Sequence, residues 1–252
     1  MKKLFTLLAL TISFSMNAQV STNSTSPTGI YASAMGNGTT ASGNESTAMG
    51  YDTTASGEAS TAMGYKTTSS AQGSTAMGKL TTASDYASLV IGQYNSSGSS
   101  VTNSATSFST SNTAFVIGNG ADASNKSDAF KVMFNGDTTV SNDLTVSGDV
   151  VISSDARLKS NIVSLGSTLP KLLQIDGKSY EMKGQQKIGV LAQEIQEVFP
   201  ELVSEDDNEM LAVNYQGLVP VLINALKEQE SKIIDQQTQI DELKELVNKL
   251  ID

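Results

Sequence analysis

The sequence predicts a mainly β solenoid or fibre in its N-terminal half and a smaller, more highly charged C-terminal half that ends in a coiled-coil helix. Three observations predict this organisation. A tripeptide motif recurs every 14 residues before residue 95, charged residues become frequent after about residue 150, and apolar residues recur every seven positions near the C-terminus. The hydrophobic fraction of 38% is below the roughly 45–50% of ordinary globular domains, which favours a repeat over one large core.

The composition excludes several classes of chemistry. The 252 residues include no His, Cys or Trp. Ser-His-Asp and Cys-His nucleophiles, His or Cys zinc sites and disulfides are therefore excluded, and we expect no cofactor and no metal. The net charge of −10 disfavours binding to nucleic acid or to an anionic membrane surface.

Residues 1–18 are typical of a secretory signal peptide. Two lysines precede an apolar run from Leu4 to Phe14, and cleavage is expected after the small residue Ala18. The apolar run is too short to span a bilayer, and no later stretch has the roughly 20 apolar residues of a membrane helix. The alternative is a buried N-terminal helix. We therefore expect a secreted or surface-associated protein without a transmembrane anchor.

Residues 19–95 carry the 14-residue repeat. Four copies of Ala-Met-Gly and one of Val-Ile-Gly begin at Ala34, Ala48, Ala62, Ala76 and Val90. Within each copy small residues alternate, as in Ser60, Ala62 and Gly64, so in a strand they share one face. This pattern predicts rungs of a narrow β-solenoid whose inward positions hold Ala, Ser and Gly because nothing larger fits. The alternative is a disordered Ser/Thr/Gly linker.

These repeats resemble the head domains of trimeric autotransporter adhesins. The resemblance rests on units such as Ser-Thr-Ala-Met-Gly at 46–50 and the Ala-Ser-Gly turn at 55–57, and it covers about residues 30–95. It implies a left-handed parallel β-roll, a homotrimer whose rolls pack side by side, and a role in adhesion. The C-terminal membrane-anchor strands of those adhesins are not expected here, and neither is autotransport.

Residues 96–152 predict a β-rich shaft or connector. A Ser/Asn/Thr-rich stretch runs to Asn112, and alternating segments follow, separated by Asn-Gly, Ser-Asn and Ser-Gly-Asp turns. The predicted strands are 114–118, 129–134, 138–140, 144–146 and 150–152. Phe115, Phe130 and Phe134 lie in these alternating segments, so we expect them in a trimer core rather than as ligand-stacking residues.

The C-terminal half holds the only candidate chemistry. Without His or Cys, a nucleophile can be activated only by a Lys or a carboxylate, and Ser154 lies five residues before Lys159. Such a pair works if burial or a nearby cation, here Arg157, favours the neutral lysine amine as a base. The alternative is that Ser153 or Ser154 caps a turn while Lys159 is solvated.

The sequence around this pair is similar to the opening of the intramolecular chaperone domain of phage tail spikes and endosialidases, peptidase family S74. The run from Ser154 to Ile162 is Ser-Asp-Ala-Arg-Leu-Lys-Ser-Asn-Ile. Further matches are the segments 188–195, 199–203 and 213–218. The resemblance spans about 99 residues in the right order.

This resemblance implies an α+β domain over residues 153–252 that trimerises, guides the upstream fibre into register and is released by autocleavage. Carried over, the scissile bond is Ser153–Ser154, the nucleophile is Ser154 and the matching lysine is Lys159, with Ser153 as the alternative nucleophile. The chain would be a single-turnover serine autoprotease without an external substrate. Residues expected to support the motif by orientation, packing or interchain hydrogen bonds are Asp155, Arg157, Asn161 and, on a predicted helix at 189–198, Gln193 and Glu194.

A heptad pattern predicts a coiled coil over residues 221–252. One core position of the heptad is occupied by Leu226, Ile233, Ile240 and Val247. The second core position, three residues later in each heptad, is occupied by Gln229, Gln236, Leu243 and Leu250. The alternative is a surface helix on its own domain. Pro220 predicts a break or kink near the start of this helix.

The sequence therefore predicts a secreted or surface-associated homotrimeric fibre, similar to an adhesin or tail fibre, whose C-terminal domain assists trimerisation and then cleaves itself off. The alternative is a non-cleaving structural or binding fibre with the C-terminal domain as a permanent trimerisation cap. Copies of the same chain are the expected partner, and a glycan or protein receptor is left open. An enzyme acting on an external glycan has little support, because Asp206 and Asp207 lie in an acidic run typical of a solvated loop.

Overall fold

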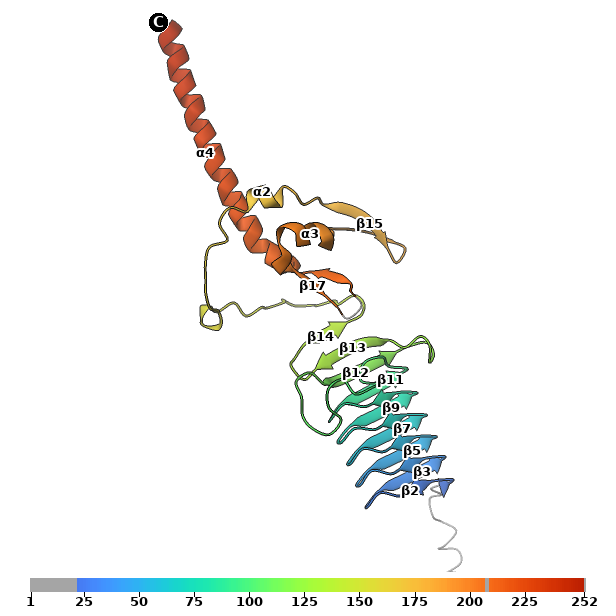
Figure 1. The fold of residues 1–252 in the computed structure, drawn as a ribbon. Coiled ribbons are helices and arrows are strands. Elements are labelled where there is room, and N and C mark those ends of the chain that lie inside the picture. The colour runs from blue at the N-terminus through green and yellow to red at the C-terminus, as the bar shows by residue number, and fades with distance from the viewer. Residues whose placement is uncertain (1–21, 207–208, 252) are drawn as a thin grey trace, which may run out of the picture. The chain divides into compact units, whose positions relative to one another are not determined.

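The computed structural model describes residues 22–206 and 209–251. The predicted signal peptide, residues 1–18, lies outside the described residues. The chain divides between Val150 and Val151 into two compact units, which are coloured blue to green and yellow to red in Figure 1.

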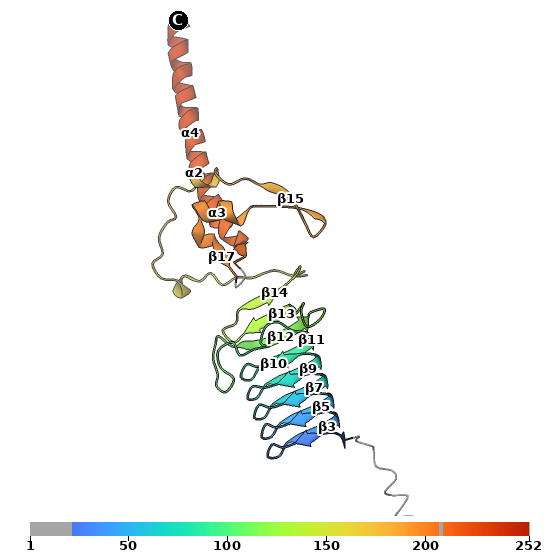
Figure 2. The ribbon, with the colours of Figure 1, turned by 45° about the vertical axis from the view of Figure 1, so that its right-hand side comes forward.

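The first unit is a β-solenoid whose strands stack in two sheets (Figures 1 and 2). The larger sheet has nine strands: β1 (Thr22–Asn23), β3 (Ser33–Asn37), β5 (Thr47–Tyr51), β7 (Thr61–Tyr65), β9 (Thr75–Lys79), β11 (Leu89–Gln93), β12 (Thr113–Asn119), β13 (Asp128–Met133) and β14 (Thr138–Val140). The smaller sheet has five: β2 (Ser26–Pro27), β4 (Thr40–Ala41), β6 (Thr54–Ala55), β8 (Thr68–Ser69) and β10 (Thr82–Ala83).

Each strand of a rung pairs in parallel with the strand 14 residues later, which confirms the predicted β-solenoid. Ala48 lies opposite Ala62, and Gly50 lies opposite Gly64. The inward columns contain alanine and serine, as predicted, but they also contain a column of four threonines that was not predicted. These are Thr39, Thr53, Thr67 and Thr81, all fully buried, whose hydroxyl oxygens have no hydrogen-bond partner among the described residues.

Glycine is required where neighbouring rungs approach most closely. Gly50 has a φ of +121°, and a Cβ atom placed on it would lie 2.1 Å from the carbonyl oxygen of Gly64. A side chain at this position would push two hydrogen-bonded strands apart. Gly38 also has a positive φ, +66°, but a Cβ atom there would come no closer than 3.6 Å to its neighbours.

The regular repeat ends with a built-in cap. Val90 pairs with Val116 rather than with a residue 14 positions on, because residues 95–112 are inserted between β11 and β12. The Asn95 side chain replaces the missing rung: its Oδ1 accepts a hydrogen bond from Thr82 N at 2.8 Å, and its Nδ2 donates to Thr82 O at 2.9 Å. The fully buried Asp85 carboxylate accepts hydrogen bonds from the backbone amides of Thr102 and Thr113. The Asn95 side chain therefore satisfies the backbone groups of Thr82 that the next strand of the smaller sheet would otherwise pair, and Asp85 holds the inserted segment and the start of β12.

The connector after the solenoid differs in part from the prediction. The predicted strands near 114–118, 129–134 and 138–140 are present as β12, β13 and β14, paired antiparallel from β12 onward. The segments 144–146 and 150–152 are described and form no strand, so that prediction is wrong for the single chain. Their apolar side chains are exposed, up to 88% for Val151, because no strand of the described chain pairs with them. Phe115 packs against Phe130 with ring centroids 6.0 Å apart.

The second unit has a small core between short helices and two hairpins. Its elements are η1 (Ala156–Leu158), α2 (Leu169–Leu172), β15 (Lys178–Met182), β16 (Gln185–Gly189), α3 (Ala192–Val198), η2 (Pro200–Leu202), β17 (Val203–Glu205), β18 (Leu211–Val213), η3 (Tyr215–Gly217) and α4 (Leu218–Ile251). The buried core consists of Ile195, Phe199 and Val221 with half-buried neighbours.

Two predicted helix boundaries need correction. The helix predicted at 189–198 begins only at Ala192, because Gly189 is the last residue of β16. The break predicted at Pro220 is absent, since α4 begins at Leu218 and continues to Ile251. Pro220 therefore lies in the first helical turn, where its missing N–H removes no intrahelical hydrogen bond.

Beyond its first turns, α4 exposes the predicted heptad stripe. Leu226 is 69% exposed and Ile240 is 46% exposed, and the other apolar heptad residues are exposed as well. The helix therefore presents an apolar face that the described part of the chain leaves uncovered. None of the helices in the described ranges combines the length and apolar character needed to cross a bilayer.

A carboxylate on α4 holds the start of α2. The Glu228 carboxylate accepts hydrogen bonds from Ser167 Oγ at 2.7 Å and from the backbone amides of Thr168 and Leu169. Thr168 Oγ1 donates to the carbonyl oxygen of Val221 at 2.9 Å. The hydrogen bonds from Ser167 and then from Thr168 lower the pKa of Glu228, because they stabilise its charged form.

We expect Gly50→Ala to destabilise the solenoid far more than Gly38→Ala. The Gly38 variant adds only the backbone strain of a left-handed conformation, about 1–2 kcal/mol. The Gly50 variant adds a clash with the neighbouring rung as well, for a total loss of about 3 kcal/mol or more. Denaturant unfolding of both variants measures the difference, and equal losses would show that rung contact does not limit this position.

We expect Glu228→Gln to destabilise the C-terminal unit more at neutral pH than at pH 3. The pKa of Glu228 is lowered in the folded state, so its contribution is present above its ordinary pKa of about 4.5 and is lost as the pH falls through the folded-state pKa. Thermal unfolding midpoints at pH 7 and pH 3 test this. Glu230→Gln, on the exposed surface of the same helix, is the matched control and should show no such pH-dependent difference.

Candidate functional site

A short turn organises the residues of the predicted motif. Asp155 is the N-cap of η1: its Oδ1 accepts a hydrogen bond from the backbone amide of Arg157 at 2.8 Å. The turn closes when the backbone amide of Lys159 donates to Ala156 O at 3.1 Å. Asp is among the best N-cap residues because its side chain satisfies an amide that the turn leaves unpaired. The sequence therefore fixes the geometry of this segment locally.

The turn brings the predicted nucleophile and the predicted base together. The Lys159 Nζ donates a hydrogen bond to Ser154 Oγ at 2.8 Å, across the three residues of η1 and its cap. Both side chains are exposed. A proton can pass between these two atoms at this distance once the lysine amine is neutral.

Arg157 is paired with Asp155 rather than with the Ser-Lys pair. Arg157 Nη2 lies 2.6 Å from Asp155 Oδ2, and Arg157 Nε donates to Asp155 Oδ1 at 3.0 Å. The guanidinium hydrogen bonds first, and the Arg157 backbone amide second, lower the pKa of Asp155, so this carboxylate stays charged. The pair is exposed, so its main effect is to hold the two side chains of the turn in one arrangement.

Asn161 follows the turn in a left-handed backbone conformation, with a φ of +52°. Asn adopts this conformation more readily than most residues other than glycine. This conformation turns the chain after Lys159, and the orienting role of Asn161 stays a prediction.

Gln193 and Glu194 are adjacent at the start of α3 but differ in their hydrogen-bond partners. Glu194 Oε1 lies 3.1 Å from Lys178 Nζ, and Glu194 Oε2 accepts from Asp176 N at 3.2 Å. The hydrogen bonds from Lys178 to Asp176 and then to Glu194 raise the pKa of Lys178. Gln193 is exposed at the edge of a groove, and its amide has no hydrogen-bond partner within 22–206 and 209–251. Neither side chain hydrogen bonds to the Ser-Lys pair within those ranges.

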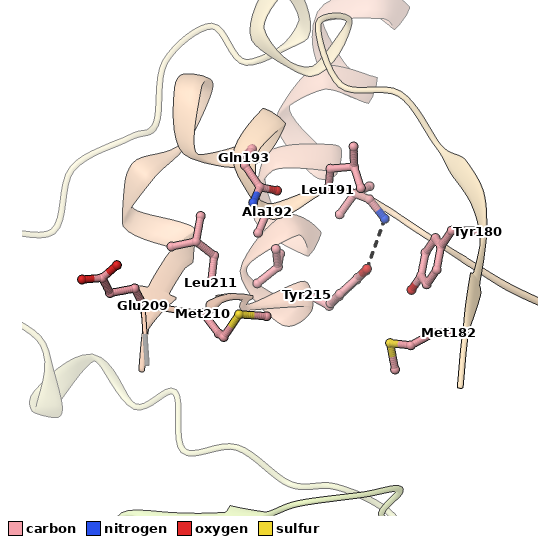
Figure 3. Close-up of a pocket in the computed structure, with 11 residues that line it drawn as sticks. Tyr180, Met182, Leu191, Ala192, Gln193, Glu209, Met210, Leu211 and Tyr215 are labelled. Carbon is pink, nitrogen blue, oxygen red and sulfur yellow. Dashed lines mark hydrogen bonds between the residues drawn. The ribbon is translucent and has the colours of Figure 1, made fainter. Parts of the chain in front are cut away.

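The groove beside Gln193 is a feature that the sequence did not predict (Figure 3). It has a volume of about 350 Å³ and lies between strand β15, the start of α3 and the hairpin β17–β18. The Tyr215 hydroxyl accepts a hydrogen bond from Val190 N at 3.2 Å across it. The residues that line it are Tyr180, Met182, Val190, Leu191, Ala192, Gln193, Glu209, Met210, Leu211, Val213 and Tyr215.

Of the acidic run, Glu205 ends β17, and Asp206 and Glu209 lie between β17 and β18. Asp206 Oδ1 accepts a hydrogen bond from Met210 N at 2.9 Å, and Glu209 has a φ of +60°. Asp207 lies outside the described residues. The Asp206 carboxylate thus stabilises the hairpin turn, and Glu205, Asp206 and Glu209 make this end of the hairpin negative.

Comparison with known families identifies two segments. Residues 154–204 match the family described as Chaperone of endosialidase. Residues 28–53, 41–67, 55–81 and 69–95 match the YadA head domain repeat. No curated protein matches the chain. The chain therefore contains head repeats similar to those of YadA, followed by a segment similar to the chaperone of endosialidase, and both resemblances predicted from the sequence are confirmed.

Proposed function

We propose that this protein is a homotrimeric fibre, secreted or held at a cell surface, whose C-terminal unit guides trimer assembly and then cleaves itself off between Ser153 and Ser154. The observation that carries the proposal is the 2.8 Å hydrogen bond between Lys159 Nζ and Ser154 Oγ, inside the segment similar to the chaperone of endosialidase. The head repeats similar to those of YadA support an adhesive or surface-structural role.

The surfaces of the single chain support assembly with other copies. Along the outer face of the large solenoid sheet, one column of half-buried or exposed apolar side chains continues from rung to rung. It contains Met35, Met49, Met63, Met77, Ile91 and Ile117. The exposed heptad stripe of α4 is a second such surface. Both are long and narrow, as expected of faces that meet along a shared fibre axis.

The proposed cleavage is a rearrangement followed by hydrolysis. Lys159, as a neutral amine, takes the hydroxyl proton of Ser154 while Ser154 Oγ attacks the carbonyl carbon of Ser153. The C–N bond between the two serines breaks, the proton passes to the departing nitrogen, and an ester joins Ser153 to Ser154 Oγ. Water then hydrolyses the ester, leaving a carboxylate on Ser153 and a free amine and hydroxyl on Ser154.

Asp155 and Arg157 act in this proposal as positioning residues. The N-cap of η1 sets the separation between residues 154 and 159, and the ion pair holds the N-cap carboxylate in place. Neither side chain hydrogen bonds to the hydroxyl of Ser154 or to the Lys159 amine within the described ranges.

A second candidate keeps the fibre and removes the chemistry. In this candidate the C-terminal unit stays attached as a permanent trimerisation cap. The exposure of Ser154 and Lys159 in the single chain favours it, because an exposed Ser-Lys pair can have a purely structural role in the turn. The two candidates differ in one measurable quantity, the mass of the folded chain.

We expect Ser154→Ala and Lys159→Ala to block self-cleavage without changing trimer yield. The first variant removes the nucleophile, and the second removes the base, which costs at least about a hundredfold in rate. Intact mass spectrometry and N-terminal sequencing after refolding detect a fragment that begins at Ser154, and light scattering measures the trimer.

Ser153→Ala is the matched control, because it changes the neighbouring serine on the other side of the scissile bond. We expect cleavage within about twofold of the wild-type rate, since its hydroxyl takes no part in the steps above. A wild-type trimer that keeps its full mass would establish the permanent cap instead. Loss of cleavage in Ser153→Ala but not in Ser154→Ala would identify Ser153 as the nucleophile.

We expect Asp155→Ala to slow cleavage about tenfold and Asp155→Asn to stay within about threefold of wild type. Asn is as good an N-cap as Asp, whereas Ala leaves the Arg157 amide unpaired at a cost of about 1 kcal/mol. The time course of fragment release measures both rates. If the Asn variant is as slow as the Ala variant, the charge of Asp155 matters rather than its capping hydrogen bond.

A further inference from the structure

The segment around the Ser-Lys pair is not covered by any part of the chain within 22–206 and 209–251. Every residue from 151 to 167 is exposed. Apolar side chains are frequent in this segment and include Leu158, Ile162, Val163 and Leu165, each more than half exposed. An exposed apolar run of this kind is costly in water and marks a contact surface. We refer to residues 158–165 as the motif arm.

The groove shown in Figure 3 is equally uncovered. Its walls are mainly apolar, and Met182, Met210 and Tyr215 are each more than half exposed to solvent. A volume of about 350 Å³ falls within the roughly 300–1,000 Å³ of clefts that bind ligands or peptide side chains. One unit therefore carries both an unpaired apolar segment and an unfilled apolar groove.

We propose that, in the assembled protein, the groove of one copy receives the motif arm of another copy. The inference rests on the proposed trimer and deepens it, because it makes the cleavage site composite. Leu158 and Ile162 would fill the apolar part of the groove between Met182, Leu191 and Met210. The unpartnered amide of Gln193 at the rim would then hydrogen bond to the backbone of the arriving arm, as an extended chain requires.

Charge favours this pairing. Lys159 lies in the motif arm, and Arg157 directly precedes the arm. Asp155 is the one acidic residue between 151 and 165, so this segment has a net positive charge. The hairpin at the rim of the groove is acidic, with Glu205, Asp206 and Glu209. A basic segment and an acidic rim attract one another and fix the direction in which the segment enters. Two acidic surfaces, by contrast, would repel in a chain with a net charge of −10.

The C-terminal end of the segment is tied down on its own chain. The Glu228 carboxylate on α4 binds Ser167 and Thr168, so the arm leaves its own helix from a fixed point. In the single chain the motif arm is exposed and the groove is open. A second copy held alongside by α4 supplies the groove that the first copy does not use.

Docking has a chemical consequence for the Ser-Lys pair. In the single chain the side chains of Ser154 and Lys159 are both exposed to water. An arm seated against a neighbouring copy would hold Ser154 and Lys159 in one arrangement and remove water from around them, which favours attack by the serine hydroxyl. Cleavage then requires an assembled neighbour.

Engineered disulfides test the docking without relying on cleavage. The chain has no cysteine, so each introduced cysteine has a single possible origin. Two differently tagged full-length chains, both carrying Ser154→Ala, are folded together, one with Ile162→Cys and the other with Met210→Cys. We expect a disulfide-linked species that carries both tags on non-reducing gels, at a level at least tenfold above the control pair.

The control pair combines Ile162→Cys with Ser231→Cys, an exposed position on α4 outside the heptad stripe. It should link poorly under the same oxidant. A trimer in which Ile162→Cys and Met210→Cys do not link between chains overturns the inference. So does a doubly substituted chain that forms only an intrachain disulfide, since the arm would then fill its own groove. Because both chains carry Ser154→Ala, these outcomes are separate from whether the wild-type chain cleaves.

Discussion

The structure depends on the hydrogen bonds between successive rungs of the solenoid. A rung buries little more than two alanines, a threonine and one or two serines, so it has no core of its own. Its backbone groups are satisfied by the rung that follows, and the close approach at Gly50 leaves no room for a side chain between the two. Order in this half of the protein is therefore collective, and the first rungs cannot form before there are others to pair with.

This constraint explains why a chain of this kind combines a repeat with a compact C-terminal unit. Parallel rungs of near-identical sequence can pair in wrong registers as easily as in the right one, both within a chain and between chains. The C-terminal unit has a conventional core around Ile195 and Phe199 and a long helix with an apolar stripe, and in the proposed assembly this unit associates before the repeat is ordered. Early association of one end restricts the registers that remain available to the other.

Much of the fold follows from the sequence because its periodicities are strong. The spacing from Ala34 to Val90 predicts the rungs, and the heptads predict most of α4. The strands predicted at 144–146 and 150–152 fail because alternation indicates strand preference, whereas a strand also needs a partner that the single chain does not supply. The threonine column was missed for another reason: each of its threonines directly follows a turn residue with a positive φ, where alternation gives no sign of which face the threonine occupies.

The candidate site was predicted in part. The pairing of Ser154 with Lys159 follows from a local turn, which short-range sequence determines. The groove around Tyr180 and Tyr215 could not be predicted, because its walls come from segments that only the tertiary fold brings together. Arg157 was expected to act on the lysine, but its neighbour Asp155 engages it.

The cap formed by Asn95 and Asp85 makes the solenoid modular in length. Asn95 closes the smaller sheet with its side chain, and β12 covers the last strand of the repeat in the larger sheet. Both contacts involve the last rung alone, so the cap does not depend on how many rungs come before. Whole 14-residue units could be gained or lost without changing any residue of the terminus. Each unit alters the height of the head by one strand spacing, about 4.8 Å. The reach of the head beyond the connector is thus set in fixed increments by copy number alone.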